Sequence, residues 1–165
     1  EITDGALYRH FKSKKKILSL LIEDIESTLL GTIKNVACQE ADPLQKLENI
    51  FFAHLSYAEQ RKGVSFILIN ETLNLHDKGL RKEMFSVVEK YLKTIESILT
   101  EGVKSGVFRK DLSIDATSFI FWGMIQSVIT HWSLSGYDFT LKKIWLTEMF
   151  SVFKKGILKR EFRLI

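Results

Sequence analysis

The sequence predicts an all-α protein, and three observations carry that prediction. The 165 residues include only one proline and nine glycines, so residues that interrupt helices are few. Long stretches are rich in Leu, Ile, Lys and Glu, and apolar residues recur in them at the helical spacing. With 45% hydrophobic residues, the chain is large enough to bury one substantial core.

The first half of the chain is expected to form four helices. Thr3 is a suitable N-cap for a short helix, and Ser13 is one for a long helix with a continuous apolar stripe. Asp42-Pro43 combines an N-cap with proline at the first helical position, and Gly63 ends that third helix. Residues 64–75 are apolar on nearly every side, which is typical of a short buried helix.

The second half is expected to form three more helices. Asp77 can cap a long helix, which Gly106 closes. Ser113 begins a helix that ends near Gly136, and Thr140 begins the last helix, which leads into a basic tail. Short loops join all seven helices.

The helix over residues 113–135 is apolar almost all the way round, so its side chains cannot all face one core. In a domain of this size, such a helix is shared between its own core and a partner. We therefore expect it to pair with the last helix of the same chain and to form a four-helix interface with a second copy. The expected interface residues are Phe119, Trp122, Ile125, Val128, Ile129, Trp132, Trp145, Phe150 and Phe153.

Charge is unevenly distributed along the chain, whose formal net charge is +4. Basic residues outnumber acidic ones by five to two in residues 1–16 and by seven to two in residues 142–165. Between these ends, twelve basic residues stand against sixteen acidic ones. The two basic ends are two candidate sites for a polyanion, and charge alone does not choose between them.

A cluster of lysines marks the start of the long helix after Ser13. Lys14, Lys15 and Lys16 occupy its first turn, where the partial positive charge of a helix N-terminus makes lysine unfavourable. A polyanion removes this conflict, because free backbone N–H groups, the helix dipole and the lysines together bind phosphate. A run of solvated lysines is the alternative interpretation.

The segment before these lysines begins with small and polar residues, as the leading end of a groove-reading helix requires. Residues 3–17 resemble the recognition helix and linker of the TetR family of transcriptional regulators, whose members commonly read T-x-G-x-L-Y-x-H-F-x-S-K-x-x-L. The matching positions are Thr3, Gly5, Leu7, Tyr8, His10, Phe11, Ser13 and Lys14, with Ile17 in place of the final Leu. The Lys15-Lys16 pair departs from the family, which often has acidic residues there.

The resemblance implies roles for individual residues. Those implied to face base edges in the major groove are Thr3, Asp4, Gly5 and Ala6. Those implied to contact phosphates are Tyr8, His10 and Lys14, with Arg9, Lys12 and Lys15 as lesser candidates. Two alternatives stay open, namely that His10 is a capping residue bonded to backbone and that Asp4 is only a favourable first-turn charge.

The resemblance also implies a division after residue 16. Residues 1–16 correspond to the remnant of a helix-turn-helix DNA-binding domain, and residues 17–165 to a ligand-binding and dimerisation domain. Family members have two further helices before the recognition helix, and Glu1 is not an initiator methionine. We therefore expect this sequence to be a fragment that binds DNA poorly by itself.

Members of the family hold an effector in a pocket between their central helices. Polar residues in apolar neighbourhoods are the candidates to line such a pocket here: His54, Tyr57, Asn70, Glu71, Asn74, Tyr91, Trp122 and Gln126. A mostly apolar cavity with these few groups suits a lipophilic or aromatic molecule. The alternative is that Glu71 and Asn74 lie on a solvated face and that Trp122 belongs to the core or the interface.

Several other classes of protein are disfavoured. The histidines at 54, 76 and 131 have no Ser, Cys or carboxylate partner at a recognisable spacing, and no zinc pattern or phosphate loop is present. We therefore expect neither an enzyme nor a cofactor or metal site, and Cys38 alone cannot form a disulfide framework. Residues 119–132 are too few and too polar to span a membrane, and no secretory signal opens the chain, so we expect a cytoplasmic protein.

The sequence therefore predicts a dimeric, ligand-responsive repressor that binds a palindromic operator in double-stranded DNA and is released by a small, largely apolar effector. An alternative from another class is a helical binding or scaffolding module whose basic ends meet a membrane surface or an acidic partner. A variant within the family would bind DNA for another purpose, such as positioning cell division.

Overall fold

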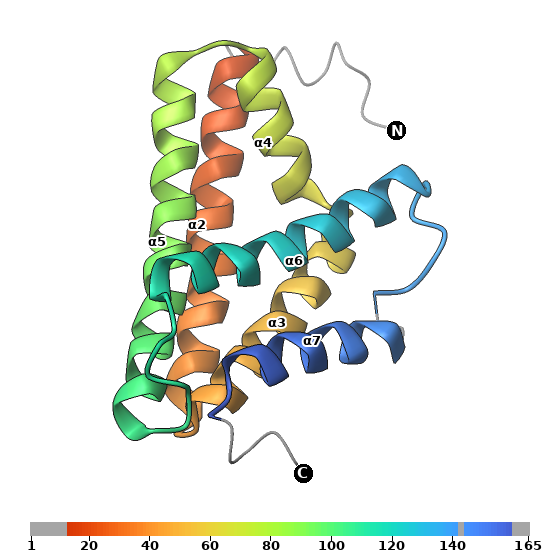
Figure 1. Cartoon of the computed structure of the whole chain (residues 1–165). Helices are drawn as coiled ribbons and strands as arrows, with labels where there is room; N and C mark the ends of the chain where they lie inside the picture. Colours follow the sequence, from red (N-terminus) through yellow and green to blue (C-terminus); the bar gives the residue numbers. More distant parts are fainter. Residues whose placement is uncertain (1–12, 142–143, 160–165) are drawn as a thin grey trace.

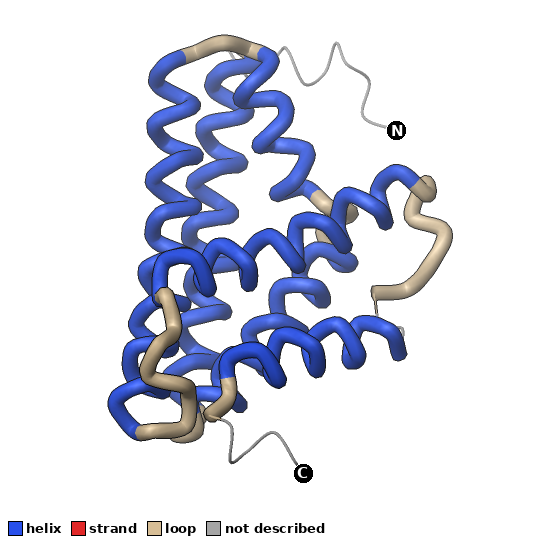
Figure 2. Tube along the Cα trace, viewed as in Figure 1, coloured by secondary structure: helices blue, strands red, loops and turns tan. Residues whose placement is uncertain are grey.

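The computed structural model describes residues 13–141 and 144–159, and every regular element in this part of the chain is a helix (Figures 1 and 2). The helices are α2 (Lys14–Gln39), α3 (Pro43–Gln60), α4 (Val64–Asn74), α5 (Lys78–Ser105), α6 (Ile114–Leu134) and α7 (Ile144–Ile157). The all-α prediction is confirmed. The short helix predicted to begin at Thr3 lies outside the described residues.

Two long helices form the frame of the fold. α2 and α5 lie side by side and run in the same direction, and α3 returns along them (Figure 1). α4 packs near the start of both long helices, while α6 crosses α5 and α3. α7 runs back below α6 and rests on α3. α4 therefore lies at the end of the molecule where α2 begins.

Aromatic side chains join α6 and α7 to the rest of the core. The ring centroid of Phe51 in α3 lies 5.5 Å from that of Phe150 in α7 and 6.4 Å from that of Phe121 in α6. Phe121 in turn lies 5.5 Å from Phe153 of α7. All four rings are buried, and each burial contributes roughly 1.5–3 kcal/mol to folding. The tilted and edge contacts are the geometries that aromatic pairs prefer.

The predicted helix starts at Ser13, Asp42 and Asp77 are confirmed. The side chains of Ser13 and Asp42 each accept a hydrogen bond from the backbone N–H three residues later, at 3.3 and 2.9 Å. Asp77 Oδ1 accepts hydrogen bonds from the backbone N–H groups of Gly79 and Leu80, at 2.9 and 3.0 Å. The predicted stop at Gly106 is also confirmed, because this residue ends α5 in the left-handed conformation with φ of 78°. These caps satisfy backbone groups that have no partner inside their own helix.

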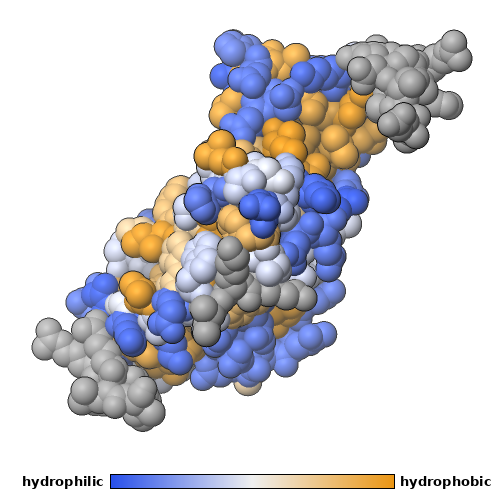
Figure 3. All heavy atoms as spheres, turned by 90° about the vertical axis from the view of Figure 1, so that its right-hand side faces the viewer, coloured by the Kyte–Doolittle hydropathy of each residue, from blue (hydrophilic) through white to orange (hydrophobic). Residues whose placement is uncertain are grey.

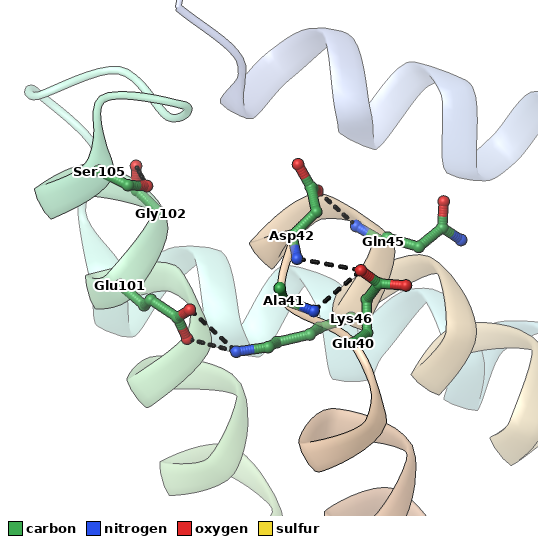
Figure 4. Close-up of polar contacts among 8 residues, drawn as sticks. All are labelled: Glu40, Ala41, Asp42, Gln45, Lys46, Glu101, Gly102 and Ser105. Atoms are coloured by element: carbon green, nitrogen blue, oxygen red, sulfur yellow. Dashed lines mark hydrogen bonds and ion pairs between the residues drawn. The ribbon is translucent and has the colours of Figure 1, made fainter.

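The turn between α2 and α3 is held by acidic side chains, and α3 is tied to α5 beside it (Figure 4). Glu40 Oε1 accepts hydrogen bonds from the N–H groups of Ala41 and Asp42 at 2.9 and 3.1 Å. Lys46 Nζ lies 2.7 Å from a carboxylate oxygen of Glu101, and the stem of this lysine is largely covered. The turn thereby fixes the angle at which α3 leaves α2.

α4 differs from the short buried helix predicted for residues 64–75. Its inward face carries Ser65, Leu68 and Thr72, which are all buried, whereas Ile67 and Leu73 are 43% and 54% exposed. The prediction of a helix is right, but that of burial on all sides is wrong. The physical reason is that α4 packs against α2, α5 and α6 from one side and leaves its other side uncovered.

Thr140 was predicted to begin the last helix, whose described part starts at Ile144. The Thr140 hydroxyl donates a hydrogen bond to Glu59 Oε1 at 2.9 Å, and the backbone N–H of Leu141 donates to the same oxygen at 2.9 Å. A carboxylate from α3 thus binds the residue that the sequence suggested as the helix cap. The α6–α7 loop is anchored to α3 as a result.

Gly102 is required by close packing at the end of α5. A Cβ atom at this position would overlap the ring of Phe108, which is fully buried, and the Phe108 N–H donates to the Gly102 carbonyl at 2.9 Å. Gly102→Ala is therefore expected to lower the free energy of unfolding by about 1–3 kcal/mol through overpacking. Urea denaturation followed by tryptophan fluorescence at a fixed protein concentration measures this loss.

Gly31→Ala provides the matched control, because a Cβ at this helical glycine would meet nothing within 4 Å. Since alanine is the better helix former, this variant is expected to gain about 0.5–1 kcal/mol. Equal denaturation midpoints for Gly102→Ala and the unmodified protein would contradict the packing argument.

Candidate functional site

A buried polar pair joins α3 to α5 in the middle of the fold. His54 Nδ1 lies 3.2 Å from the Tyr91 hydroxyl oxygen, and both residues are almost completely buried. Burial lowers the pKa of His54 from 6.5 to about 4, and it raises the pKa of the Tyr91 hydroxyl. At neutral pH both groups are therefore uncharged, and one hydrogen bond joins the two neutral side chains.

This pair borders a small cavity lined by residues of five helices, which we term the inner cavity. Its volume is about 30 Å³. The residues that line it are Ile25, Leu29 and Leu30 of α2, His54 of α3, Ser65 and Ile69 of α4, Met84, Val87, Val88 and Tyr91 of α5, and Trp122 and Gln126 of α6. Apolar walls with a few convergent polar groups are typical of small-molecule sites.

A larger hollow opens toward solvent between α4 and α5, and we term it the outer groove. Its volume is about 510 Å³, and it is lined by Ile69, Thr72, Leu73, Arg81, Lys82, Met84, Phe85, Val88 and Trp122. Figure 3 shows apolar residues gathered in the upper part of the face that includes α4. The groove is thus an apolar surface with two cations beside it.

The outer groove and the inner cavity have four wall residues in common, Ile69, Met84, Val88 and Trp122. The two spaces therefore lie next to each other, on either side of these apolar side chains. Trp122 is only partly buried, so it forms part of the core and of the groove wall at once. Together the two spaces form one candidate site that leads from solvent to the His54–Tyr91 pair.

Four of the eight residues predicted to line a ligand pocket come together here. His54, Tyr91, Trp122 and Gln126 all border the inner cavity, although they come from three different helices. Their convergence is a fact of geometry, and their contact with a ligand stays a prediction.

The other four predicted residues lie away from both spaces. The Tyr57 hydroxyl lies 3.2 Å from Thr28 Oγ1 at the surface of α2. Asn70 and Asn74 are exposed, and the Asn70 amide donates to a backbone carbonyl of its own helix at 3.0 Å. Glu71 forms an ion pair on the outside of α4. No geometric observation connects these four residues with the pocket.

Sequence reasoning missed the polar groups that α4 contributes. Ser65 and Thr72 are seven residues apart, so they share one helical face with Ile69 between them. Ser65 Oγ, Thr72 Oγ1 and His54 Nε2 are buried without a hydrogen-bond partner among the described residues. The available signal was two hydroxyl residues at helical spacing within an otherwise apolar segment.

The first turn of α2 is tied to α4 and to the start of α5. Lys14 Nζ lies 2.6 Å from a Glu71 oxygen, and Lys15 Nζ lies 2.8 Å from an Asp77 oxygen. The hydrogen bond with Lys15 lowers the pKa of the Asp77 carboxyl, and the same bond raises the pKa of the lysine. Both lysines were predicted to contact phosphate, and the structure shows that they also hold the α2 start against α4 and α5.

The remaining residues predicted to contact DNA lie outside the described residues. They are Thr3, Asp4, Gly5, Ala6, Tyr8, Arg9, His10 and Lys12. Their roles stay predictions.

Most residues predicted for the dimer interface belong to the core of the protomer. The buried ones are Ile125, Val128, Ile129, Trp132, Phe150 and Phe153, and Trp122 is partly buried. These side chains are covered by their own chain, so they have little surface to offer a second chain. The apolar residues exposed on α6 and α7 are Phe119, Ile120, Leu134, Trp145 and Val152, of which only Phe119 and Trp145 were predicted.

Within the described residues, no group of acidic, His or Cys side chains is arranged to hold a metal ion. In the same residues, no helix combines the length and the apolar character that crossing a membrane requires.

Residues 17–155 match the family model of the TetR group described as YsiA-like protein, C-terminal region. The match covers most of the chain, and the chain therefore belongs to the TetR family of transcriptional regulators. This confirms the resemblance that residues 3–17 carried.

The relatives of this chain include proteins whose names describe different functions. The nucleoid occlusion factor SlmA of Marinomonas sp. is 25% identical over 95% of this chain and 79% of its own length. The fatty acid metabolism regulator protein of Bacillus subtilis is 24% identical over 85% of this chain and 72% of its own. The repressor KstR2 of Mycolicibacterium smegmatis is 33% identical over 69% of this chain, and the chain spans 56% of its length. This chain also spans 54% of the length of the nucleoid occlusion factor SlmA of Shewanella pealeana.

Solved structures share the fold at low sequence identity. KstR2 of Mycobacterium tuberculosis has a TM-score of 0.78 at 19% identity, covering 95% of this chain and 79% of its own. FadR of Bacillus subtilis in complex with stearoyl-CoA has a TM-score of 0.70 at 21% identity, with coverages of 93% and 79%. AibR in complex with isovaleryl coenzyme A and operator DNA has a TM-score of 0.70 at 13% identity, with coverages of 94% and 80%.

The buried state of His54 makes a prediction about stability and pH. Because its pKa is about 4 in the fold and near 6.5 in the unfolded chain, the unfolded state binds more protons between these values. Stability therefore falls as the pH is lowered through this window, by about 2 kcal/mol between pH 7.5 and pH 5.0. Urea denaturation across this pH range measures the slope.

His54→Gln removes the titrating group, so it is expected to flatten this slope whatever its effect on absolute stability. His131→Gln, a change at an exposed position of α6, serves as the control and is expected to keep the slope. An unaltered slope in His54→Gln would show that other groups produce the pH dependence.

Proposed function

We propose that this protein is a ligand-responsive DNA-binding transcriptional regulator, a repressor that leaves its operator when a small, largely apolar effector binds between α4, α5 and α6. The observation that carries the proposal is the apolar outer groove and its continuation to the buried His54–Tyr91 pair. A regulator of this kind acts on DNA and needs no catalytic group, and we place it in the cytoplasm.

The apolar part of the effector that we propose to bind here is the acyl group of an acyl-CoA or of a similar anionic amphiphile. The walls of the outer groove are apolar, which suits an acyl group, and Arg81 and Lys82 beside them suit phosphate or carboxylate groups. Two proteins that share the fold are described in complex with stearoyl-CoA and with isovaleryl coenzyme A. Both ligands combine an apolar acyl group with a polyanionic carrier.

We propose that DNA is bound by a domain of which residues 1–16 are the last part, while residues 17–165 sense the effector and dimerise. The start of the family match at residue 17 supports this division. The DNA-contacting residues proposed are Thr3, Asp4, Gly5, Ala6, Tyr8, Arg9, His10, Lys12, Lys14 and Lys15.

The contacts at the start of α2 offer a physical route from the groove to DNA. Glu71 precedes Thr72, which lines the outer groove, and Glu71 is paired with Lys14 in the first turn of α2. An effector that moves α4 away from α5 shifts Glu71 and pulls on Lys14. The DNA-contacting segment directly before α2 then changes its orientation, and the two recognition helices of a dimer lose the spacing that an operator requires.

The second copy in this proposal binds on the exposed face of α6 and α7. The apolar residues Phe119, Ile120 and Val152 are 54%, 57% and 73% exposed there. The helical glycines Gly123 and Gly156 have open space above them, which allows close approach of another helix. A two-fold dimer of this kind reads a palindromic operator.

A second candidate function is binding of DNA to position cell division, as the name of the SlmA relatives indicates for those proteins. The outer groove favours the effector-responsive repressor instead. Selection of genomic fragments bound by the full-length protein separates the two, because sites clustered in one promoter support a repressor and sites spread around the chromosome support nucleoid occlusion.

Lys14→Ala in the full-length protein is expected to weaken operator binding and to reduce the slope of log affinity against log salt concentration by about 0.9, since one phosphate contact is lost. Fluorescence anisotropy with a selected operator across a KCl series measures both effects. Lys34→Ala, at an exposed position further along α2, is the control and is expected to change neither. Equal behaviour of the two variants would remove Lys14 from the DNA interface.

Stearoyl-CoA and octanoyl-CoA are the probes for the effector, and at least one is expected to release the operator. The double variant Arg81→Gln, Lys82→Gln is expected to need on the order of tenfold more of it, because two partly screened charge contacts are lost. Lys78→Gln, which lies at the start of α5 outside the groove, is the control. If the double variant and the control release the operator at the same acyl-CoA concentration, the coenzyme A group binds somewhere other than beside Arg81 and Lys82.

A further inference from the structure

Three polar atoms in the candidate site are buried without a partner among the described residues: His54 Nε2, Ser65 Oγ and Thr72 Oγ1. Their residues are only 2%, 4% and 2% exposed. A buried polar group that lacks a hydrogen bond destabilises the fold, so native proteins rarely retain one without a reason. That three of them line the same site is the observation that needs an explanation.

These groups are not scattered over the site but mark its two ends. Ser65 and Thr72 lie on one face of α4, seven residues apart, which corresponds to roughly 10 Å along the helix axis. Thr72 lines the outer groove together with Arg81 and Lys82, whereas Ser65 lines the inner cavity together with His54. The apolar side chains shared by both spaces lie between the two polar ends.

We infer that the effector carries an oxygen, a hydroxyl or a carbonyl, at the end that enters first, and that His54 and Ser65 bind this oxygen in the inner cavity. The site then selects an oxygenated acyl chain or ring over a plain hydrocarbon one. This inference rests on the proposed function and deepens it, since it names a chemical feature of the effector.

The chemistry of the two residues suits a neutral oxygen. The Ser65 hydroxyl can donate or accept a hydrogen bond. His54 is neutral and shares its Nδ1 with the Tyr91 hydroxyl, so its Nε2 donates when Tyr91 donates to Nδ1, and accepts in the other tautomer. A carbonyl or a hydroxyl can be matched by one of these arrangements. A carboxylate has no cation among the residues that line the inner cavity.

The size of the inner cavity agrees with this assignment. Its volume of about 30 Å³ holds one small group and not a long chain. A terminal methyl in this place would leave both polar atoms without a partner and without water. A site built to hydrogen-bond a substrate oxygen discriminates strongly against an analogue that lacks it.

The test compares matched probes on the full-length protein by isothermal titration calorimetry. The probes are hexanoyl-, octanoyl- and decanoyl-CoA, each beside its omega-hydroxy derivative. For the chain length that reaches the inner cavity, the hydroxylated probe is expected to bind about tenfold more tightly than its parent. In Ser65→Ala this preference is expected to fall toward one, through weaker binding of the hydroxylated probe alone.

Ser133→Ala is the matched control, because Ser133 Oγ is also buried without a partner in the described part of the chain but lines neither space. It is expected to keep the preference. Thermal unfolding of the ligand-free variants adds a second readout, since removal of an unpaired buried hydroxyl is expected to leave Ser65→Ala at least as stable as the unmodified protein.

Equal affinity for both members of every pair would overturn the inference and leave the proposed function intact, as would a preference that survives in Ser65→Ala and in His54→Gln. Binding of none of the probes would overturn the proposed effector class and this inference together, while operator binding by the same protein would show that the DNA-binding half of the proposal stands.

Discussion

The apolar face of α5 is the surface on which four other helices assemble. α2, α3, α4 and α6 all pack against it, and its buried stripe runs from Leu80 to Leu99. Because α5 is the longest of the described helices, α4 covers only its first part and α6 only its later part. The outer groove lies on α5 between α4 and α6, and Trp122 of α6 forms part of its wall. The candidate site is therefore a consequence of helix lengths and crossing points.

The polar groups in this site oppose stability, and in the proposed function they serve to bind the effector. His54, Ser65 and Thr72 each bury an atom that has no partner among the described residues, which costs about 1–3 kcal/mol apiece, where apolar residues of similar size would pack without that cost. Proteins commonly depart from the most stable sequence at functional sites and compensate elsewhere. Here the aromatic contacts around Phe51 and the capped helix ends supply the compensation.

The ion pairs at the start of α2 serve position more than stability. The side chains of Lys14 and Lys15 are about half exposed, at 52% and 55%, and exposed pairs contribute little to folding. They nevertheless connect α2 to two helices that border the groove. The basic first turn that the sequence predicts to bind a polyanion is therefore also bonded to α4 and to the start of α5, as the proposed route from the groove to DNA requires.

The sequence by itself determined the features that depend on neighbours within one helical turn. The caps at Ser13, Asp42 and Asp77 and the stop at Gly106 are satisfied by nearby backbone groups, so the helices could be predicted in order. Only the tertiary structure decided which face of α4 points inward, that Glu59 binds the residue expected to cap α7, and that Ile125, Trp132 and Phe150 are buried in the core of their own chain. These outcomes depend on side chains far away in the sequence, and a helix that is apolar on all sides does not indicate which side will be covered by its own chain.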